Sequence, residues 1–281
     1  MKDAVDLVAS FWTIAGLMPG ALNDFSPFDF KDRVESAARA GFTGLGIWHT
    51  DLAHILSRRS LSEMKSILDD NGMRHVEVEF LTDWFLDGER KARSDLLKRD
   101  LFAAAEALGA RCVKVGDFNH ESCPMSRLVD SFAALCQEAA QHGTRIAFEP
   151  MSAAMLDNLE DSLRMVEGAG ADNGGIMLDI WQVVNLGVPY AEVRRIPARY
   201  LVGVELNDAK VRRPGAPKAM ADEPRMFCGE GEFDIDGFIA AVKSTGYAGP
   251  WGVEVISEKL AMMPLAEVTA RAYQTTRAQF P

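Results

Sequence analysis

The segment Arg145-Ile-Ala-Phe-Glu-Pro150 is a short apolar run that closes on an acidic residue, and three later segments do the same. These segments are Gly175-Ile-Met-Leu-Asp179, Leu201-Val-Gly-Val-Glu205 and Trp251-Gly-Val-Glu254. Short runs of bulky and β-branched residues predict buried strands. Because helical segments separate the four runs, they predict parallel strands whose acidic ends meet at one edge.

The same alternation of strand-like and helix-like segments runs along the whole chain. The expected strands are 5–11, 44–48, 75–81, 111–116, 145–149, 175–179, 201–206 and 251–256. Parallel strands joined by helices form right-handed crossovers, and eight such units favour a closed (β/α)8 TIM barrel of the α/β class over an open sheet. We expect residues 1–281 to form this single domain, since we find no linker or low-complexity tract.

The expected helices carry recognisable boundary signals. Ser60-Leu-Ser-Glu63 has the spacing of a capping box, and Gly72 follows the end of that helix. The seven helices expected are Phe28–Ala40, Ser60–Asn71, Glu89–Leu108, Ser126–His142, Asn158–Glu167, Ile235–Thr245 and Pro264–Gln279. The long irregular stretch from Asn207 to Glu232 follows an acidic strand end, and loops of this length in compact domains are usually functional or disordered.

Composition narrows the classes of function. The formal net charge of −11 disfavours nucleic-acid binding, which needs clustered Lys and Arg, but it leaves a phosphorylated small substrate open. No apolar run reaches the roughly 18 residues that a membrane span requires. Asp3 and Asp6 interrupt the positive region that a signal peptide needs. The four cysteines form no CxxC pair, and we expect reduced thiols in a cytoplasmic protein.

The acidic strand ends are expected to face the interior of the barrel together. Side chains alternate along a strand, so Ala147 shares the inward face with Glu149, while Ile146 and Phe148 face the helices. The same phase turns Asp179, Glu205 and Glu254 inward, at the C-terminal ends where barrels of this type carry their active sites. Four carboxylates suit one hard divalent cation, with Mn²⁺ or Mg²⁺ favoured and Zn²⁺ or Co²⁺ as alternatives.

Four carboxylates around a dication leave a formal charge of −2, which is costly when buried. Lys114, in phase on the preceding strand, can offset one charge; otherwise one glutamate keeps a proton because its like-charged neighbours raise its pKa. The structural alternative is that the acidic residues cap helices or pair with Arg and Lys. The four residues in phase on consecutive strands favour the metal site over that alternative.

With these four acidic strand ends, the sequence resembles the xylose-isomerase-like barrel superfamily. This superfamily includes sugar isomerases and epimerases, inosose dehydratases and 3-dehydroshikimate dehydratases. The resemblance covers nearly the whole chain and is strongest in three places: Arg145–Pro150, Leu178-Asp179 and Gly246-Tyr-Ala-Gly-Pro-Trp-Gly-Val-Glu-Val255. It implies that Glu149, Asp179, Glu205 and Glu254 bind the metal, and that Glu149 and Glu254 exchange the substrate proton from opposite faces.

Two positions depart from the family pattern. The third ligand, commonly His, is Glu205 here, and the family's Asp-x-x-His reads Asp179-Ile-Trp-Gln182. Gln182 can hold a substrate hydroxyl but cannot exchange protons. The resemblance therefore implies a metal site with one changed ligand. It supports the metal site more strongly than it supports any one reaction.

Six further side chains are candidates for substrate binding, each with a structural alternative. Glu79 and Lys114 form a pair at the mouth or serve structure alone, and Arg225 approaches substrate or is a solvated loop residue. His49 lines the pocket or caps the next helix, and Trp12 forms an aromatic wall or packs the barrel. The six candidates are Glu79, Lys114, Gln182, Arg225, His49 and Trp12.

The expected activity is a metal-dependent isomerase or epimerase of a small sugar or polyol ketone, through an enediolate. A dehydratase acting on an inosose or 3-dehydroshikimate type of substrate shares that intermediate and is the alternative. A nuclease related to endonuclease IV needs histidine-bound zinc and a basic groove, which these strand ends do not offer. A non-catalytic sugar-binding barrel also remains open. By analogy with related barrels, we expect a homo-dimer or homo-tetramer.

Overall fold

The computed structural model of this protein describes residues 5–118, 121–152, 154–211 and 224–281. Eight parallel strands pair in sequence order, and β8 pairs with β1 to close the barrel. This confirms the expected TIM barrel. The strands are β1 (Leu7–Ala9), β2 (Gly44–Trp48), β3 (His75–Leu81), β4 (Cys112–Val115), β5 (Arg145–Phe148), β6 (Gly174–Asp179), β7 (Leu201–Leu206) and β8 (Trp251–Val253).

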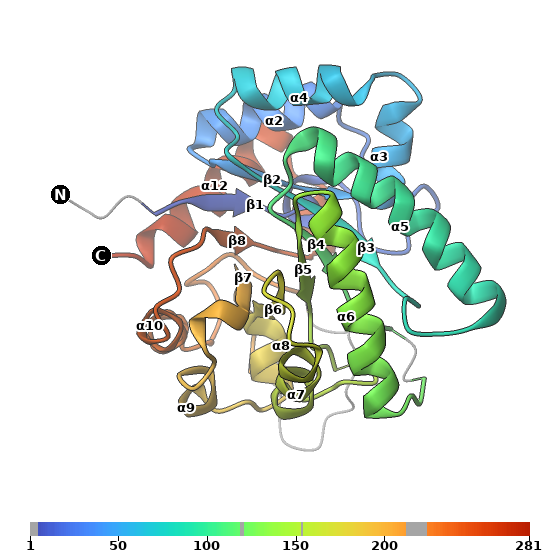
Figure 1. Cartoon of the computed structure of the whole chain (residues 1–281). Helices are drawn as coiled ribbons and strands as arrows, with labels where there is room; N and C mark the ends of the chain where they lie inside the picture. The colour runs from blue at the N-terminus through green and yellow to red at the C-terminus, as the bar shows by residue number, and fades with distance from the viewer. Residues whose placement is uncertain (1–4, 119–120, 153, 212–223) are drawn as a thin grey trace.

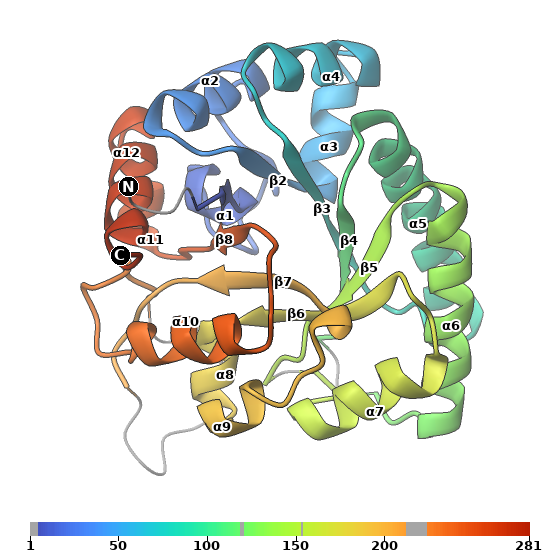
Figure 2. The same ribbon diagram turned by 60° about the vertical axis from the view of Figure 1, so that its left-hand side comes forward.

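Helices surround the ring of strands, as Figures 1 and 2 show from two sides. The large helices follow successive strands and pack against their outward faces, where the main apolar core lies. The helices are α1 (Phe11–Ile14), α2 (Phe30–Ala40), α3 (His49–Leu56), α4 (Leu61–Asp70), α5 (Gly88–Leu108), α6 (Met125–Gln141), α7 (Leu159–Ala169), α8 (Ile180–Asn185), α9 (Tyr190–Val193), α10 (Ile235–Ser244), α11 (Glu258–Ala261) and α12 (Leu265–Ala278).

The seven expected helices are present as α2, α4, α5, α6, α7, α10 and α12, with ends shifted by one or two residues. The capping box at Ser60 is confirmed: its backbone N–H donates to Glu63 Oε2 at 2.6 Å, and the N–H of Glu63 donates to Ser60 Oγ at 3.2 Å. Helix α2 ends at Gly41, whose φ of 112° favours glycine. A Cβ there would also lie 2.5 Å from the ring of Tyr273.

The expected first and last strands are too long, while the ends of the other strands differ by at most one residue. The first strand ends at Ala9 instead of residue 11, because the chain turns into α1 across the barrel mouth. There the hydroxyl of Thr13 donates to the carbonyl of Val253 at 2.7 Å and accepts from the N–H of Val255 at 2.8 Å. The last strand correspondingly ends at Val253. Helices of four to eight residues, such as α1 and α3, were not expected, since they are too short to show an amphipathic period.

The barrel interior holds a small apolar cluster in its lower part, beside the ion pair of Glu77 and Arg111, and acidic side chains at its mouth. The buried residues of this cluster are Cys112, Ala147, Met177 and Val202. Gly252 leaves space above it, because a Cβ on Gly252 would lie 2.7 Å from Cγ of Glu205. The sequence alternation thus places small residues where the acidic side chains must fit.

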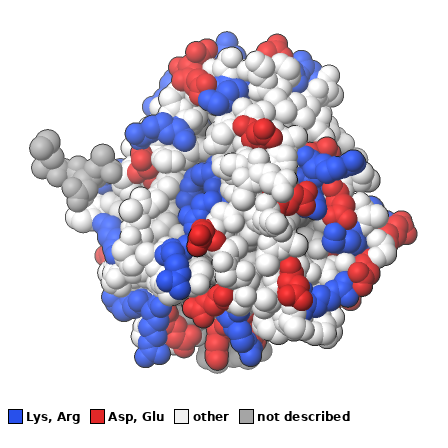
Figure 3. Space-filling view, in the orientation of Figure 1, with Lys and Arg blue, Asp and Glu red and all other residues white. Residues whose placement is uncertain are grey.

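In the described part of the chain, none of the helices combines the length and the apolar character needed to cross a bilayer. On the molecular face drawn in Figure 3, acidic and basic side chains are interspersed, and no continuous basic stripe is visible.

Candidate functional site

The four acidic strand ends lie at the C-terminal mouth of the barrel. Glu149 and Glu254 directly follow β5 and β8, Asp179 ends β6, and Glu205 lies in β7. All four side chains are buried. Carboxylate oxygens of Glu149, Glu205 and Glu254 lie within 4.8 Å of one another, and Asp179 is outside this group of three.

Lys114, from β4, is enclosed in the barrel and contacts three carboxylates. Its Nζ lies 2.5 Å from Glu205 Oε1, 2.9 Å from Glu79 Oε2 and 3.6 Å from Glu77 Oε2. Ser10, just after β1, also donates to Glu205 Oε1, at 2.5 Å. Lys114 and Glu79 therefore form the expected pair, in a position that supports Glu205 from the interior side.

Arg225 inserts between two of the acidic strand ends. Its Nη1 lies 2.9 Å from Asp179 Oδ2 and 2.7 Å from Glu254 Oε2, and it donates to the Glu254 carbonyl at 3.1 Å. The guanidinium also lies 5.2 Å from the ring centroid of Trp181, a cation–π contact. Arg225 is thus a buried partner of the site, which contradicts the alternative of a solvated loop arginine.

Asp179 is held on its other oxygen as well. Oδ1 accepts from the side chain of Asn207 at 2.7 Å and from the backbone N–H of Trp181 at 3.0 Å, where it caps α8. Helix capping and pairing with cations, the structural alternative, therefore describes part of what Asp179, Glu205 and Glu254 do. Glu149 differs, because no described residue gives it a side-chain hydrogen bond or ion pair.

Burial and mutual repulsion raise the pKa values of these carboxyl groups. Burial, and then the neighbouring Glu254, Glu205 and Asp179, raise the pKa of Glu149 well above its usual value. Burial and Glu254 raise the pKa of Glu205 to about 7, although Lys114 opposes the shift. Burial also raises the pKa of Asp179 and of Glu254, against the lowering effect of Arg225.

The charges of this region do not balance. Within residues 5–118, 121–152, 154–211 and 224–281, six carboxylates, those of Glu77, Glu79, Glu149, Asp179, Glu205 and Glu254, face three cationic side chains, those of Arg111, Lys114 and Arg225. Among the described residues, the buried Oε2 of Glu205 has no hydrogen-bond partner. The close oxygens, the unpartnered Oε2 and the excess negative charge fit a divalent cation held by Glu149, Glu205 and Glu254.

The other half of the mouth is aromatic. Trp12 and Trp48 approach to 5.0 Å between ring centroids, and Trp48 stacks at 6.5 Å on both Phe11 and Phe80. His49 begins α3, and its Nδ1 accepts from the backbone N–H of Phe80 at 3.3 Å. Burial lowers the pKa of His49, so the neutral ring is favoured. This arrangement leaves its proton on Nε2.

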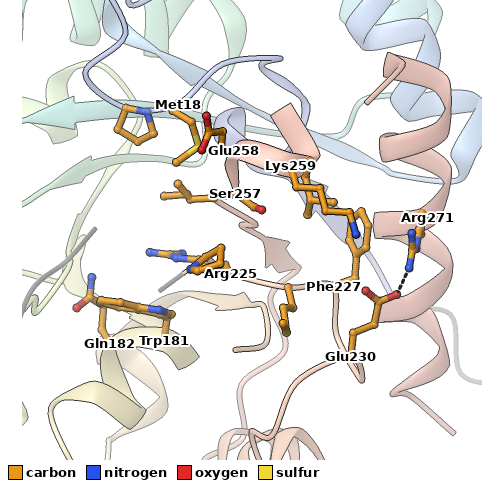
Figure 4. A pocket seen from close by; sticks show the side chains of 15 residues that line it. Met18, Trp181, Gln182, Arg225, Phe227, Glu230, Ser257, Glu258, Lys259 and Arg271 are labelled. Atoms are coloured by element: carbon orange, nitrogen blue, oxygen red, sulfur yellow. Dashed lines mark hydrogen bonds and ion pairs between the residues drawn. The ribbon is translucent and has the colours of Figure 1, made fainter. Parts of the chain in front are cut away.

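A cavity of about 620 Å³ opens beside the acidic group, by which we mean the side chains of Glu149, Glu205 and Glu254. Gln182 and Arg225 line it, as Figure 4 shows, with Trp181, Ser257 and Lys259. Two of the six expected substrate-binding side chains therefore reach this cavity. The other four, Glu79, Lys114, His49 and Trp12, are not among the residues that line it.

Sequence reasoning missed Ser10, Asn207 and Asp208. Each is a polar residue within two positions of the end of a barrel strand, and that signal could have identified all three. Their targets, carboxylates on other strands and a distant loop, depend on tertiary structure. Part of the irregular stretch expected from Asn207 to Glu232 lies outside the described residues, namely 212–223.

Residues 34–279 match the protein family described as xylose isomerase-like TIM barrel. A 3-dehydroshikimate dehydratase from Pseudomonas aeruginosa is 26% identical over 243 residues, which cover 83% of this chain and 37% of that protein. This chain thus spans well under half of that relative. An inosose isomerase from Halalkalibacterium halodurans is 22% identical over 234 residues, covering 80% of this chain and 82% of the relative.

Among solved structures, an IOLI protein with a bound zinc atom superposes with a TM-score of 0.80 at 18% identity, covering 99% of this chain and 98% of that one. At this identity the likeness concerns the fold.

Proposed function

Because this chain belongs to the xylose isomerase-like TIM barrel family, we propose that it is a divalent-metal-dependent isomerase or epimerase of a small sugar or polyol ketone. The observation that carries the proposal is the group of three buried carboxylates, Glu149, Glu205 and Glu254, with oxygens within 4.8 Å of one another. Asp179 is the proposed fourth ligand. A bound dication would supply Lewis-acid chemistry, stabilising negative charge on the oxygens of a keto-polyol.

In this proposal Glu149 is the first choice for the base that removes the proton beside the substrate carbonyl. Burial raises its pKa well above the usual value, and it has no Lys or Arg partner among the described residues. A carboxylate of raised pKa can both take up and return a proton near neutral pH. Glu254 is the proposed partner on the opposite face, where Arg225 supports its carboxylate at 2.7 Å.

The cavity beside the acidic group is the proposed substrate pocket. Gln182 and Arg225 can donate hydrogen bonds to hydroxyl or carbonyl oxygens there. The aromatic residues across the mouth, Trp12, Trp48 and Phe80, can exclude water. We propose that Mn²⁺ or Mg²⁺ is the metal in the cell. Zn²⁺ belongs in any test, because the superposed IOLI protein holds zinc.

Dehydration is the second candidate reaction. Two relatives named 3-dehydroshikimate dehydratase, at 26% and 24% identity, support it. Both reactions begin with loss of the same proton. In the dehydratase, the electron pair left on carbon forms the new double bond and breaks the bond to the β-hydroxyl, which takes up the proton held by the glutamate and leaves as water. In the isomerase or epimerase, that proton returns to a carbon.

The test incubates the metal-loaded protein in D₂O with ketoses, inososes and 3-dehydroshikimate. Deuterium at a carbon beside the carbonyl supports isomerisation or epimerisation, whereas a new ultraviolet absorbance from a conjugated product supports dehydration. Glu149→Gln should abolish either signal, and Glu63→Gln, on the exposed start of α4, should retain it. Binding of these compounds without exchange or elimination would contradict the proposal and favour a non-catalytic sugar-binding barrel.

A further inference from the structure

Asp208 is a buried carboxylate that neither the acidic group nor the cavity includes. Its two oxygens accept four backbone N–H groups. Oδ1 accepts from Ala209 at 2.9 Å and Phe233 at 3.0 Å, and Oδ2 accepts from Gly229 and Gly231, both at 2.9 Å. No described Lys or Arg forms an ion pair with it. Among the described residues, these backbone dipoles are therefore the main groups that offset its charge.

These bonds gather the loop of residues 226–233 around one side chain. Backbone bonds reinforce the closure: the N–H of Asp208 donates to the carbonyl of Met226 at 3.0 Å, and the N–H of Met226 donates back at 2.7 Å. The N–H of Glu232 donates to the carbonyl of Ala209 at 2.8 Å. If the loop moved away, the buried carboxylate would keep only the N–H of Ala209 and would lose its other three donors, which is strongly unfavourable.

The fit between Asp208 and this loop leaves no spare volume. A Cβ on Gly231 would lie 2.3 Å from Oδ1 of Asp208 and 2.6 Å from the carbonyl oxygen of Ala209. Gly231 therefore permits a close approach of backbone to carboxylate that no other residue allows without rearrangement.

Arg225 is the residue immediately before this loop. The backbone N–H of Arg225 donates to the carbonyl of Ile256 at 2.9 Å, in the segment that follows β8. The backbone of Arg225 is therefore held on one side by Ile256 and on the other by the anchored Met226. From there its side chain reaches Asp179 and Glu254 and lies on the face of Trp181. Figure 4 shows Arg225 projecting into the cavity between Trp181 and Ser257.

We propose that Asp208 is a positioning residue: by anchoring the 226–233 loop, it sets the guanidinium of Arg225 between Asp179 and Glu254. The consequence for catalysis rests on the proposed function, so the position of Arg225 and the rate of turnover are measured separately.

The first measurement follows the guanidinium itself. The side-chain N–H resonances of Arg225 in ¹⁵N-labelled protein are identified by their disappearance in Arg225→Gln. In Asp208→Asn, which keeps the shape of the side chain but turns an N–H₂ group toward backbone donors, these resonances should shift toward those of a solvated arginine. The backbone amides of Arg225 and Met226 should also exchange with deuterium at least about tenfold faster, because local opening becomes easier.

Asp51→Asn is the matched control. Asp51 is equally buried and accepts from the backbone N–H of Ser26 at 2.9 Å and from Arg33 at 2.5 Å, so its loss should lower stability. The Arg225 resonances should stay unchanged in this variant. If Asp208→Asn leaves them unchanged too, in a protein that is folded, Asp208 does not position Arg225 and the inference is wrong.

The second measurement is a double-mutant cycle on turnover of whichever substrate the D₂O assay identifies. Asp208→Asn should lower kcat/KM by about tenfold to a hundredfold, as small displacements of positioning groups do. In the Arg225→Gln background the same change should cost less than about twofold, since residues that act through one another are not additive. Additive losses would overturn the catalytic part. Wild-type protein that turns over nothing would contradict the proposed function, while the resonance test would still decide on Asp208.

Discussion

Replacing Glu205 by Gln should change how the stability of the metal-free protein depends on pH. In the folded chain Glu205 is fully buried beside Lys114 and Ser10, and burial and then Glu254 raise its pKa from 4.5 to about 7. In the unfolded chain the carboxyl regains its ordinary pKa. Between these two values the folded protein holds a proton that the unfolded protein has lost.

The sign and size of the effect follow from proton linkage. Because the folded state binds the extra proton, its free energy of unfolding falls as pH rises from about 4.5 to about 7. Each tenfold change in an acid dissociation constant corresponds to about 1.4 kcal/mol. The ionisation of Glu205 therefore lowers the free energy of unfolding by about 3 kcal/mol across this pH window. The glutamine side chain of the variant cannot titrate. The stability of Glu205→Gln relative to wild type should therefore rise by about 3 kcal/mol between pH 4.5 and 7.5.

Urea unfolding in EDTA, followed by circular dichroism at half-unit steps of pH, measures this difference. Glu63→Gln is the control, because Glu63 is an exposed capping residue whose pKa is lowered by Ser60. A difference between Glu205→Gln and wild type that stays constant within about 1 kcal/mol across the window would refute the reasoning. It would mean that Lys114 and Ser10 stabilise the ionised carboxylate of Glu205 as well as water does.

Three other outcomes are expected. Mn²⁺ should bind the wild-type protein in calorimetric titrations, and Glu149→Gln should lower the affinity for Mn²⁺ by more than about tenfold, since losing even a group that only orients a metal ligand lowers affinity by that factor. Equal affinities of the two proteins would exclude Glu149 as a ligand. Arg33→Met should lower the free energy of unfolding by about 3–5 kcal/mol in urea, because it leaves the buried Asp51 unpaired; a loss below about 1 kcal/mol would contradict this. Ser60→Ala should cost about 1 kcal/mol in the same assay through the capping box of α4, with Ser62→Ala as its control.

The barrel could be predicted from the sequence because its signals are local. Runs such as 145–149 and 201–206 are apolar over the length of one strand, and glycines such as Gly41 and Gly72 mark helix ends. Short elements across the mouth lack such signals. Helix α1, for example, is fixed by the hydroxyl of Thr13 on β8, a contact more than 200 residues away in sequence.

The acidic residues of the candidate site were also visible in the sequence, whereas their partners were not. Strand phase alone turns Glu149, Glu205 and Glu254 toward one another, and the structure brings their oxygens together. Phase cannot indicate which oxygen of Asp179 meets Arg225, because Arg225 reaches it from a loop outside the regular strands. The metal-binding and catalytic roles of these residues stay predictions until the experiments above are done.

The family resemblance implies a histidine at the position of Glu205, and the neighbours of Glu205 account for a glutamate there. A neutral imidazole would need no counterion, whereas a glutamate adds a negative charge to a site that already holds several. Lys114 lies 2.5 Å from that carboxylate and is itself enclosed by Glu77 and Glu79, so burial does not remove its proton and its pKa lies well above the usual value. Lys114 therefore offsets part of the negative charge that Glu205 adds in place of a neutral histidine. Lys114→Met should therefore weaken Mn²⁺ binding less in Glu205→Gln than in wild type, since the neutral glutamine does not need the ammonium group.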